Sequence, residues 1–312
     1  MISLPCLAKK RPRKKPVDPY ESMNFADATQ RFIANQWIGL NYNMDKFFSN
    51  QTYKITTNKS MIMAYYGFFK KEGLKPEYNY DLKIKVHLPN TTKKMRITFE
   101  KERDDIFESN NSIAGNMQSR TSSTKAGGAV GKSTYAAGLT YLFSENAYFQ
   151  TFLDSGLKII LPLDPFLKLR FQKSIETQAV NIFASQKFIE YRQDGFSEIT
   201  QLSFFKKMNK WFQTELINTL SWNDASDTFI HRNNLLLYQL IDDKKSMSYS
   251  AGANAKLSPT FYYDSYDVSV NYRQLIHNNW LFAYLSIGAD FPKEKDFQAQ
   301  KFVQFRLEVF FR

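Results

Sequence analysis

The residues most suggestive of chemistry run from Ala126 to Thr134 and read A-G-G-A-V-G-K-S-T. This is a relaxed form of the glycine-rich loop that cradles nucleotide phosphates, with Ala126 where the first glycine normally stands. Such a loop joins a buried strand to a helix whose N-terminus holds the phosphates. Here the preceding residues are polar, and Tyr135, Ala137 and Leu139 alternate like a strand. The sequence therefore favours a Gly/Ser-rich surface loop that enters a strand over a nucleotide site.

Other catalytic and metal-binding patterns do not emerge. His87, His231 and His277 are far apart and show no paired spacing of metal ligands. There is no G-x-S-x-G sequence, and a serine, histidine and acid drawn from separate segments cannot be recognised as a triad from sequence. The sequence therefore predicts no catalytic residue, no metal site and no cofactor.

Charged residues instead recur at every second position of otherwise apolar segments. Successive side chains of a strand point to opposite faces, so each such segment has one apolar and one polar face. At the C-terminal end, Val303, Phe305, Leu307, Val309 and Phe311 fall on one face, with mostly polar residues between them. The charged residues predicted to share the polar face are Lys83, Lys85, Arg96, Glu100, Lys168, Arg170, Glu215, Asp267, Arg273, Arg306 and Glu308.

The net charge of +12 arises largely from a short N-terminal run. Six basic residues lie within seven positions, at Lys9, Lys10, Arg11, Arg13, Lys14 and Lys15. A run of like charges is usually a solvated tail, so we expect no nucleic-acid partner. Residues 1–8 look like the end of a signal peptide, although the apolar part is shorter than such a signal requires. The single cysteine, Cys6, excludes an intrachain disulfide and fits a lipid-attachment motif poorly.

The alternating segments predict strands that cross a membrane. No run of about 18 apolar residues exists, so no membrane-spanning helix is expected, whereas barrel strands leave only a weak hydropathy signal. A soluble β-sandwich also alternates, but many segments here reach the 9–11 residues of a tilted membrane strand. Tyrosine, tryptophan and phenylalanine gather near their ends, as in Trp222, Trp280 and 261–263. An all-β fold, an antiparallel transmembrane β-barrel, is therefore predicted.

Fourteen strands are expected within residues 51–312, with twelve as the alternative. They are placed at 58–70, 78–88, 94–103, 134–143, 148–162, 165–174, 179–192, 195–206, 209–222, 228–241, 245–257, 261–275, 279–291 and 298–311. Residues 1–50 are expected to hold a signal remnant, the basic tail and a periplasmic or plug segment. Apolar residues at near-helical intervals between Ala28 and Phe48 predict a short amphipathic helix, although residues 37–43 could equally form a first strand.

The sequence resembles a group of uncharacterised Gram-negative outer-membrane β-barrel proteins over roughly residues 50–312. The segments that carry the resemblance are 82–89, 157–171, 210–216, 233–238 and 272–282, the last followed by Phe291-Pro292. They describe strand architecture, so the resemblance implies a fold and an outer-membrane location but no activity. The final strand is also similar to the last strand of such barrels, which implies recognition by the barrel-assembly machinery, although Arg312 follows the aromatic residue that usually ends it.

These features favour a non-enzymatic role, either a passive pore or a structural envelope protein with a charged lumen. The polar-face charges could select solutes, or they could form a mixed-sign network that fills a closed lumen. The expected partners are outer-membrane lipid and lipopolysaccharide, and the oligomeric state is open. An outer-membrane enzyme with an extracellular-rim site is an alternative, although the His-x-Ser motif of outer-membrane phospholipases is missing. A soluble β-rich binding protein is the other alternative.

Overall fold

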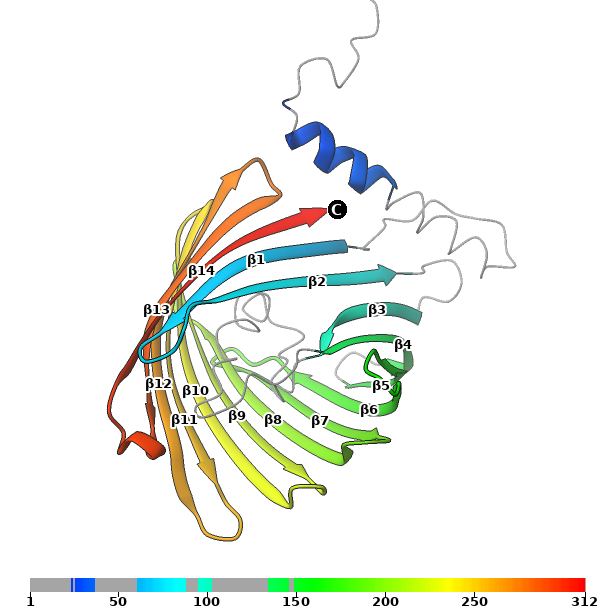
Figure 1. Cartoon of the computed structure of the whole chain (residues 1–312), viewed down its shortest axis with the longest axis vertical. Helices are drawn as coiled ribbons and strands as arrows, with labels where there is room; N and C mark the ends of the chain where they lie inside the picture. The colour runs from blue at the N-terminus through cyan, green and yellow to red at the C-terminus, as the bar shows by residue number, and fades with distance from the viewer. Residues whose placement is uncertain are drawn as a thin grey trace, which may run out of the picture.

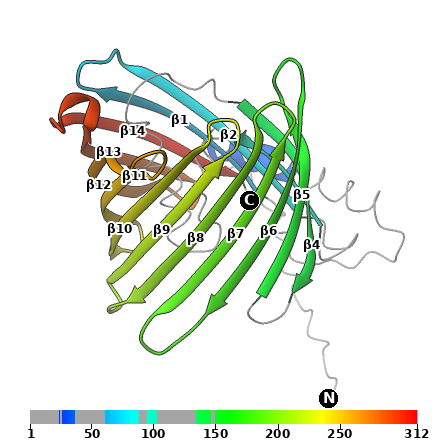
Figure 2. The same cartoon turned by 90° about the horizontal axis from the view of Figure 1, so that it is seen from below.

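The chain folds into one closed, antiparallel β-barrel, seen here in a computed structural model (Figure 1). The structure describes residue 24 and residues 26–36, 61–87, 95–102, 134–145 and 149–311. Each strand pairs with its neighbour in sequence, and β1 (Met61–Lys71) pairs with β14 (Gln300–Phe311) to close the wall. Figure 2 shows the tilted strands side by side in a wall that curves round on itself. Closure leaves no unpaired edge, as a membrane-spanning sheet requires.

The predicted fourteen strands are confirmed. The strands between β1 and β14 are β2 (Glu77–His87), β3 (Met95–Glu102), β4 (Thr134–Glu145), β5 (Phe149–Lys158), β6 (Asp164–Ile175), β7 (Asn181–Tyr191), β8 (Gly195–Lys207), β9 (Phe212–Asn223), β10 (Thr228–Asp242), β11 (Lys245–Lys256), β12 (Tyr262–His277) and β13 (Leu281–Pro292). The largest error is at β5, which ends at Lys158 rather than at residue 162. Residues 126–133 of the glycine-rich stretch lie outside the described part, and Thr134 begins β4.

The two ends of the barrel differ in what they carry. We call the end at which β1 begins and β14 ends the near end, and the opposite end the far end. The link between β12 and β13 lies at the near end, whereas the link 103–133 and the short link 159–163 lie at the far end. The other links show no clear alternation of short and long between the two ends.

The outer face of the barrel is rich in exposed apolar side chains. On β12 and β13, Val268, Val270, Leu285 and Ile287 are exposed, and alternate residues such as Ser269 and Ser286 are buried. On β14, Phe305 is exposed whereas Arg306 is only 1% exposed. Soluble proteins rarely present such a continuous apolar surface to water, so this face is built for lipid.

A helix at residues 26–36 lies beside the near end, next to the C-terminus of β14 (Figure 1). Asn24 caps it, because its side-chain Oδ1 accepts a hydrogen bond from the backbone N–H of Asp27 at 2.8 Å. The expected helix is present in this segment, but two of its apolar residues, Phe32 and Ile33, are exposed. Asp27, Gln30 and Ala34 face the barrel instead, one helical turn apart. Residues 37–60 lie outside the described residues, and no described helix could span a membrane.

Candidate functional site: the charged inner face of the barrel

Two arginines share one buried glutamate on the inner face of the C-terminal strands. The Nε–H of Arg306 donates to Glu308 Oε1 at 3.1 Å, and both side chains are almost fully buried. Arg273 on β12 donates from Nε to Oε2 of the same carboxylate at 3.2 Å. Because β13 separates β12 from β14, Arg273 and Glu308 can meet only across the concave side of the wall. The carboxylate therefore ties three strands together.

Aromatic rings pack against these two arginines. The guanidinium of Arg306 lies 4.1 Å from the ring centre of Tyr284 and 5.1 Å from that of Tyr65. Arg273 lies 3.8 Å from the ring centre of Phe282. Rings attract cations through their quadrupole, and this attraction grows when water is excluded. The cluster is thus held by charge pairing and by stacking together.

Two more ion pairs cross a strand in the same way. Lys71 of β1 lies 2.9 Å from Asp290 of β13, and both side chains are buried. Arg232 of β10 lies 3.4 Å from Asp267 of β12. Buried charges are tolerated when they are paired, so these contacts stiffen the wall from β10 round to β1.

The inner face from β5 to β7 carries more positive charge. Arg170 lies 3.1 Å from Asp154, and its guanidinium lies 4.7 Å from the ring centre of Phe152. Lys168 has no carboxylate partner among the residues described and lies over the ring of Phe166. Lys187, on the neighbouring strand, is buried on the same face. Cations therefore outnumber carboxylates at this part of the wall.

Glu215 lies in a more apolar part of the inner face. Its side chain is buried beside Ile217, Leu236 and Tyr238, and the Tyr238 hydroxyl is its hydrogen-bond partner. The inner face is thus not uniformly polar. This explains why the run 233–238 gives no clean alternation in the sequence.

The remaining residues expected on the polar face lie on β2 and β3. Lys83 and Lys85 are half-buried and point to the face of β2 opposite to that of the apolar Leu82 and Ile84. Arg96 is exposed, and its guanidinium lies 6.0 Å from the ring centre of Phe152. Glu100 belongs to β3, but its side chain lies outside the described part.

Sequence reasoning missed Lys71, Asp154, Arg232 and Asp290 as members of the charged face. Alternation could have identified Asp154 and Asp290, whereas Lys71 and Arg232 stand in irregular runs. Within the described ranges, no cluster of three His, Cys, Asp or Glu residues could hold a metal.

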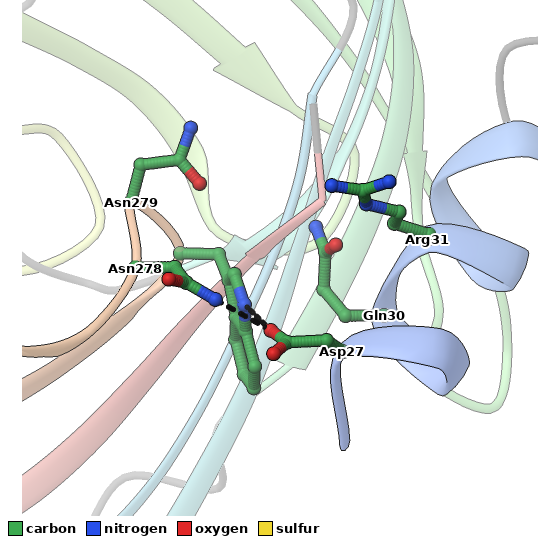
Figure 3. Close-up of a pocket in the computed structure, with 6 residues that line it drawn as sticks. Asp27, Gln30, Arg31, Asn278 and Asn279 are labelled. Carbon is green, nitrogen blue, oxygen red and sulfur yellow. Dashed lines mark hydrogen bonds between the residues drawn. The ribbon is translucent and has the colours of Figure 1, made fainter. Parts of the chain in front are cut away.

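At the near end, the helix docks on the link between β12 and β13. The carboxylate of Asp27 accepts a hydrogen bond from Asn278 Nδ2 at 2.7 Å (Figure 3). It also lies 2.9 Å from His277 Nε2 and accepts a hydrogen bond from Trp280 Nε1 at 3.0 Å. Gln30 donates to the backbone carbonyl of Phe310 at 3.1 Å, so the helix also contacts the end of β14. An open pocket of about 410 Å³ lies between helix and link. The hydrogen bond with His277, followed by that from Trp280, lowers the pKa of Asp27.

Replacing Asp27 should release the helix. In Asp27→Ala the three donors lose their shared acceptor, so we expect trypsin to cleave after Arg31 several times faster than in the native chain. The lowered pKa implies that docking is complete at neutral pH and is lost as the pH falls through the pKa of docked Asp27. The matched control is Asp243→Ala, an exposed aspartate in another near-end link. Equal cleavage rates in both variants would show that Asp27 does not hold the helix.

Comparisons with known proteins gave matches among solved structures only. No family model matches the sequence, and no curated protein sequence matches it either. A loop-deletion mutant of OmpT, an outer-membrane protein of Vibrio cholerae, is 8% identical with a TM-score of 0.50, over 81% of this chain and 99% of that chain. The outer-membrane channel DcaP of Acinetobacter baumannii is 7% identical with a TM-score of 0.45, over 82% of this chain and 96% of that chain. With its closed wall and apolar exterior, the chain has the architecture of a porin-like β-barrel of the bacterial outer membrane.

Proposed function

We propose that the protein is a passive, non-enzymatic pore with a weak preference for anionic solutes. The observation that carries this proposal is a wall of fourteen strands whose inner face bears charged and polar side chains. Strands about 4.8 Å apart and tilted by about 40° give a barrel about 28 Å across between backbones. Eight strands enclose a space that side chains alone fill, and fourteen enclose a wider one. Charged side chains in that space are stable when they are paired or in contact with water.

The preference for anions follows from the uneven charge of the wall. From β10 round to β1, four cations contact three carboxylates in the clusters described above, so the net charge of this region is small. Around Lys168, Arg170 and Lys187 cations outnumber carboxylates, so we expect a positive potential there. Side chains of one charge that line a pore attract ions of the opposite charge and repel ions of the same charge.

Planar-bilayer conductance tests the proposal. The refolded native chain should give ohmic channels, and in a potassium chloride gradient its reversal potential should indicate a preference for chloride. Lys168→Glu should shift that potential toward cation selectivity, because it reverses a charge on the inner face. The control is Lys173→Glu, a reversal on the outer face of the same strand that should leave selectivity unchanged.

The other outcomes separate the alternatives. A folded barrel that never conducts would exclude the pore and favour a structural envelope protein. Equal shifts from both lysine variants would exclude the proposed selectivity region. Hydrolysis of a substrate panel at the surface of intact cells would favour an enzyme with a site at the rim.

We also propose that the near end faces the periplasm, since outer-membrane barrels keep short turns and both termini there. Lipid and lipopolysaccharide would then contact the apolar exterior, and the assembly machinery would recognise β14. Membrane fractionation tests the outer-membrane location, and the gel mobility of the protein with and without heating tests whether the barrel is folded. A heat-shifted band in the outer-membrane fraction is the expected result, and a soluble protein without such a shift would contradict it.

A further inference from the structure

A belt of outward-facing residues surrounds the barrel at one depth. On most strands, the sixth residue counted from the far end points outward. It is apolar around most of the wall: Tyr66, Leu82, Ile97, Leu139, Leu153, Leu169, Ala251, Ile287 and Phe305. On β12 the nearest outward residue is Val268. Six residues of tilted strand reach about 15 Å from the far end, well inside an apolar band about 25 Å tall.

On four consecutive strands the same position is polar. The residues are Gln186 on β7, Thr200 on β8, Asn218 on β9 and Asn233 on β10. Gln186 stands directly opposite Thr200, and Asn218 stands directly opposite Asn233. These four residues form what we call the polar arc. Lipid tails offer no hydrogen bonds, so carboxamides and hydroxyls at this depth are costly when lipid covers them.

A hydrogen-bonded carboxylate adjoins the polar arc. Gln186 Nε2 donates to Glu198 Oε1 at 2.6 Å, and Thr200 Oγ1 donates to Gln186 Oε1 at 2.6 Å. Glu198 is the fourth residue of β8 from the far end, and it also points outward. A charge on the lipid face near the membrane centre costs more than any neutral group. The outer face of β7–β10 is therefore ill suited to lipid, whereas the outer face around Ile287 on β13, four strands from β9, suits it well.

We propose that the outer face of β7–β10 is the surface on which a second copy of this chain packs within the membrane. Carboxamides and hydroxyls both donate and accept hydrogen bonds, so the polar arc can pair with an identical arc. His231 is the fourth residue of β10, at the depth of Glu198, and the two lie on either side of β9. A two-fold axis through β9 along the membrane normal brings Glu198 of one copy opposite His231 of the other.

That arrangement is an isologous interface, in which one patch meets itself. Ala251, exposed on the adjacent β11, leaves room for the partner wall to approach, as small residues do between membrane helices. A different protein would need its own matching arc and acidic and basic groups. The self-matching chemistry therefore favours a second copy of the same chain. The proposal requires the barrel to span a membrane but does not depend on whether it conducts.

Crosslinking in isolated outer membranes tests this interface. In a Cys6→Ser background, Asn218→Cys places the only thiol beside the proposed axis, and Ile287→Cys places it at the same depth on β13, four strands from β9. A short bis-maleimide should convert the residue-218 variant into a covalent dimer and leave the residue-287 variant monomeric. A heat-shifted band in both variants shows that the barrel is folded.

Three results would overturn the proposal. The first is the absence of a crosslink in a folded residue-218 variant. The second is an adduct with a different protein, and the third is an equal dimer yield from both variants. Adding Gln186→Leu and Asn233→Leu to the residue-218 variant should lower the dimer yield by about tenfold, because two sets of hydrogen bonds between copies are lost. An unchanged yield in that folded variant would exclude the polar arc as the source of the contact.

Discussion

Ile287→Arg should destabilise the barrel by about 2–4 kcal/mol, the cost of a basic residue on the lipid face near the bilayer midplane. Ile287 lies in the middle of β13, points outward and is more than half exposed. Its neighbours on that face, Leu285 and Val268, are apolar, so no carboxylate is at hand to pair with the new charge. Urea unfolding of the protein in phospholipid vesicles measures the effect as a lower midpoint.

Leu161→Arg provides the matched control. Leu161 is 97% exposed in the link 159–163 at the far end, beyond the strands. Surface changes of this kind usually alter stability by less than about 0.5 kcal/mol. If Ile287→Arg proves as harmless as Leu161→Arg, the outer face of β13 does not contact lipid, and a soluble β-rich protein becomes the better interpretation.

Glu308→Gln should have an effect of similar or greater size, through the inner face. The change keeps the shape of the side chain but removes the charge that Arg306 and Arg273 share. Removing one partner of a buried ion pair typically costs about 3–5 kcal/mol, because the remaining charge is left uncompensated. We expect a lower urea midpoint, with the heat-shifted band lost at a lower temperature.

Two further variants separate charge from packing. Glu176→Gln, at an exposed position of the near-end link between β6 and β7, should leave the midpoint unchanged. Adding Arg306→Met to Glu308→Gln should recover part of the loss, because the more exposed Arg273 can then be hydrated. A double variant whose loss equals the sum of the single losses would show that Arg306 and Glu308 are not coupled.

Much of the fold was predictable because membrane strands impose a period of two on the sequence. The strands β12, β13 and β14 alternate almost without interruption, and their faces are confirmed by the exposure of Val270 and the burial of Asn271. The end of β5 was misplaced because residues 159–161 form an apolar run that looks like the continuation of a strand. In the structure, Ile159 and Leu161 belong to an exposed link.

The arrangement of the inner face was less predictable. Alternation placed Arg273 and Glu308 on polar faces, but their meeting across β13 depends on register and curvature, which one strand does not encode. Arg232 went unnoticed because it lies beside a run in which Leu235 points outward and Leu236 inward. The docking of the helix through Asp27 was also missed, since a single carboxylate that meets one turn leaves no periodic signal.

The seam between β1 and β14 has a consequence for how the chain reaches its native state. Ile62 pairs with Phe311, a contact between residues about 250 positions apart in the sequence. Every partly folded form that lacks this contact exposes two sheet edges, each able to recruit another chain. Contacts between such distant residues form slowly, because a large loop must close before any bonding energy is recovered. The last step of folding is therefore the one most open to aggregation, and the one that a chaperone or an insertion catalyst would have to guard.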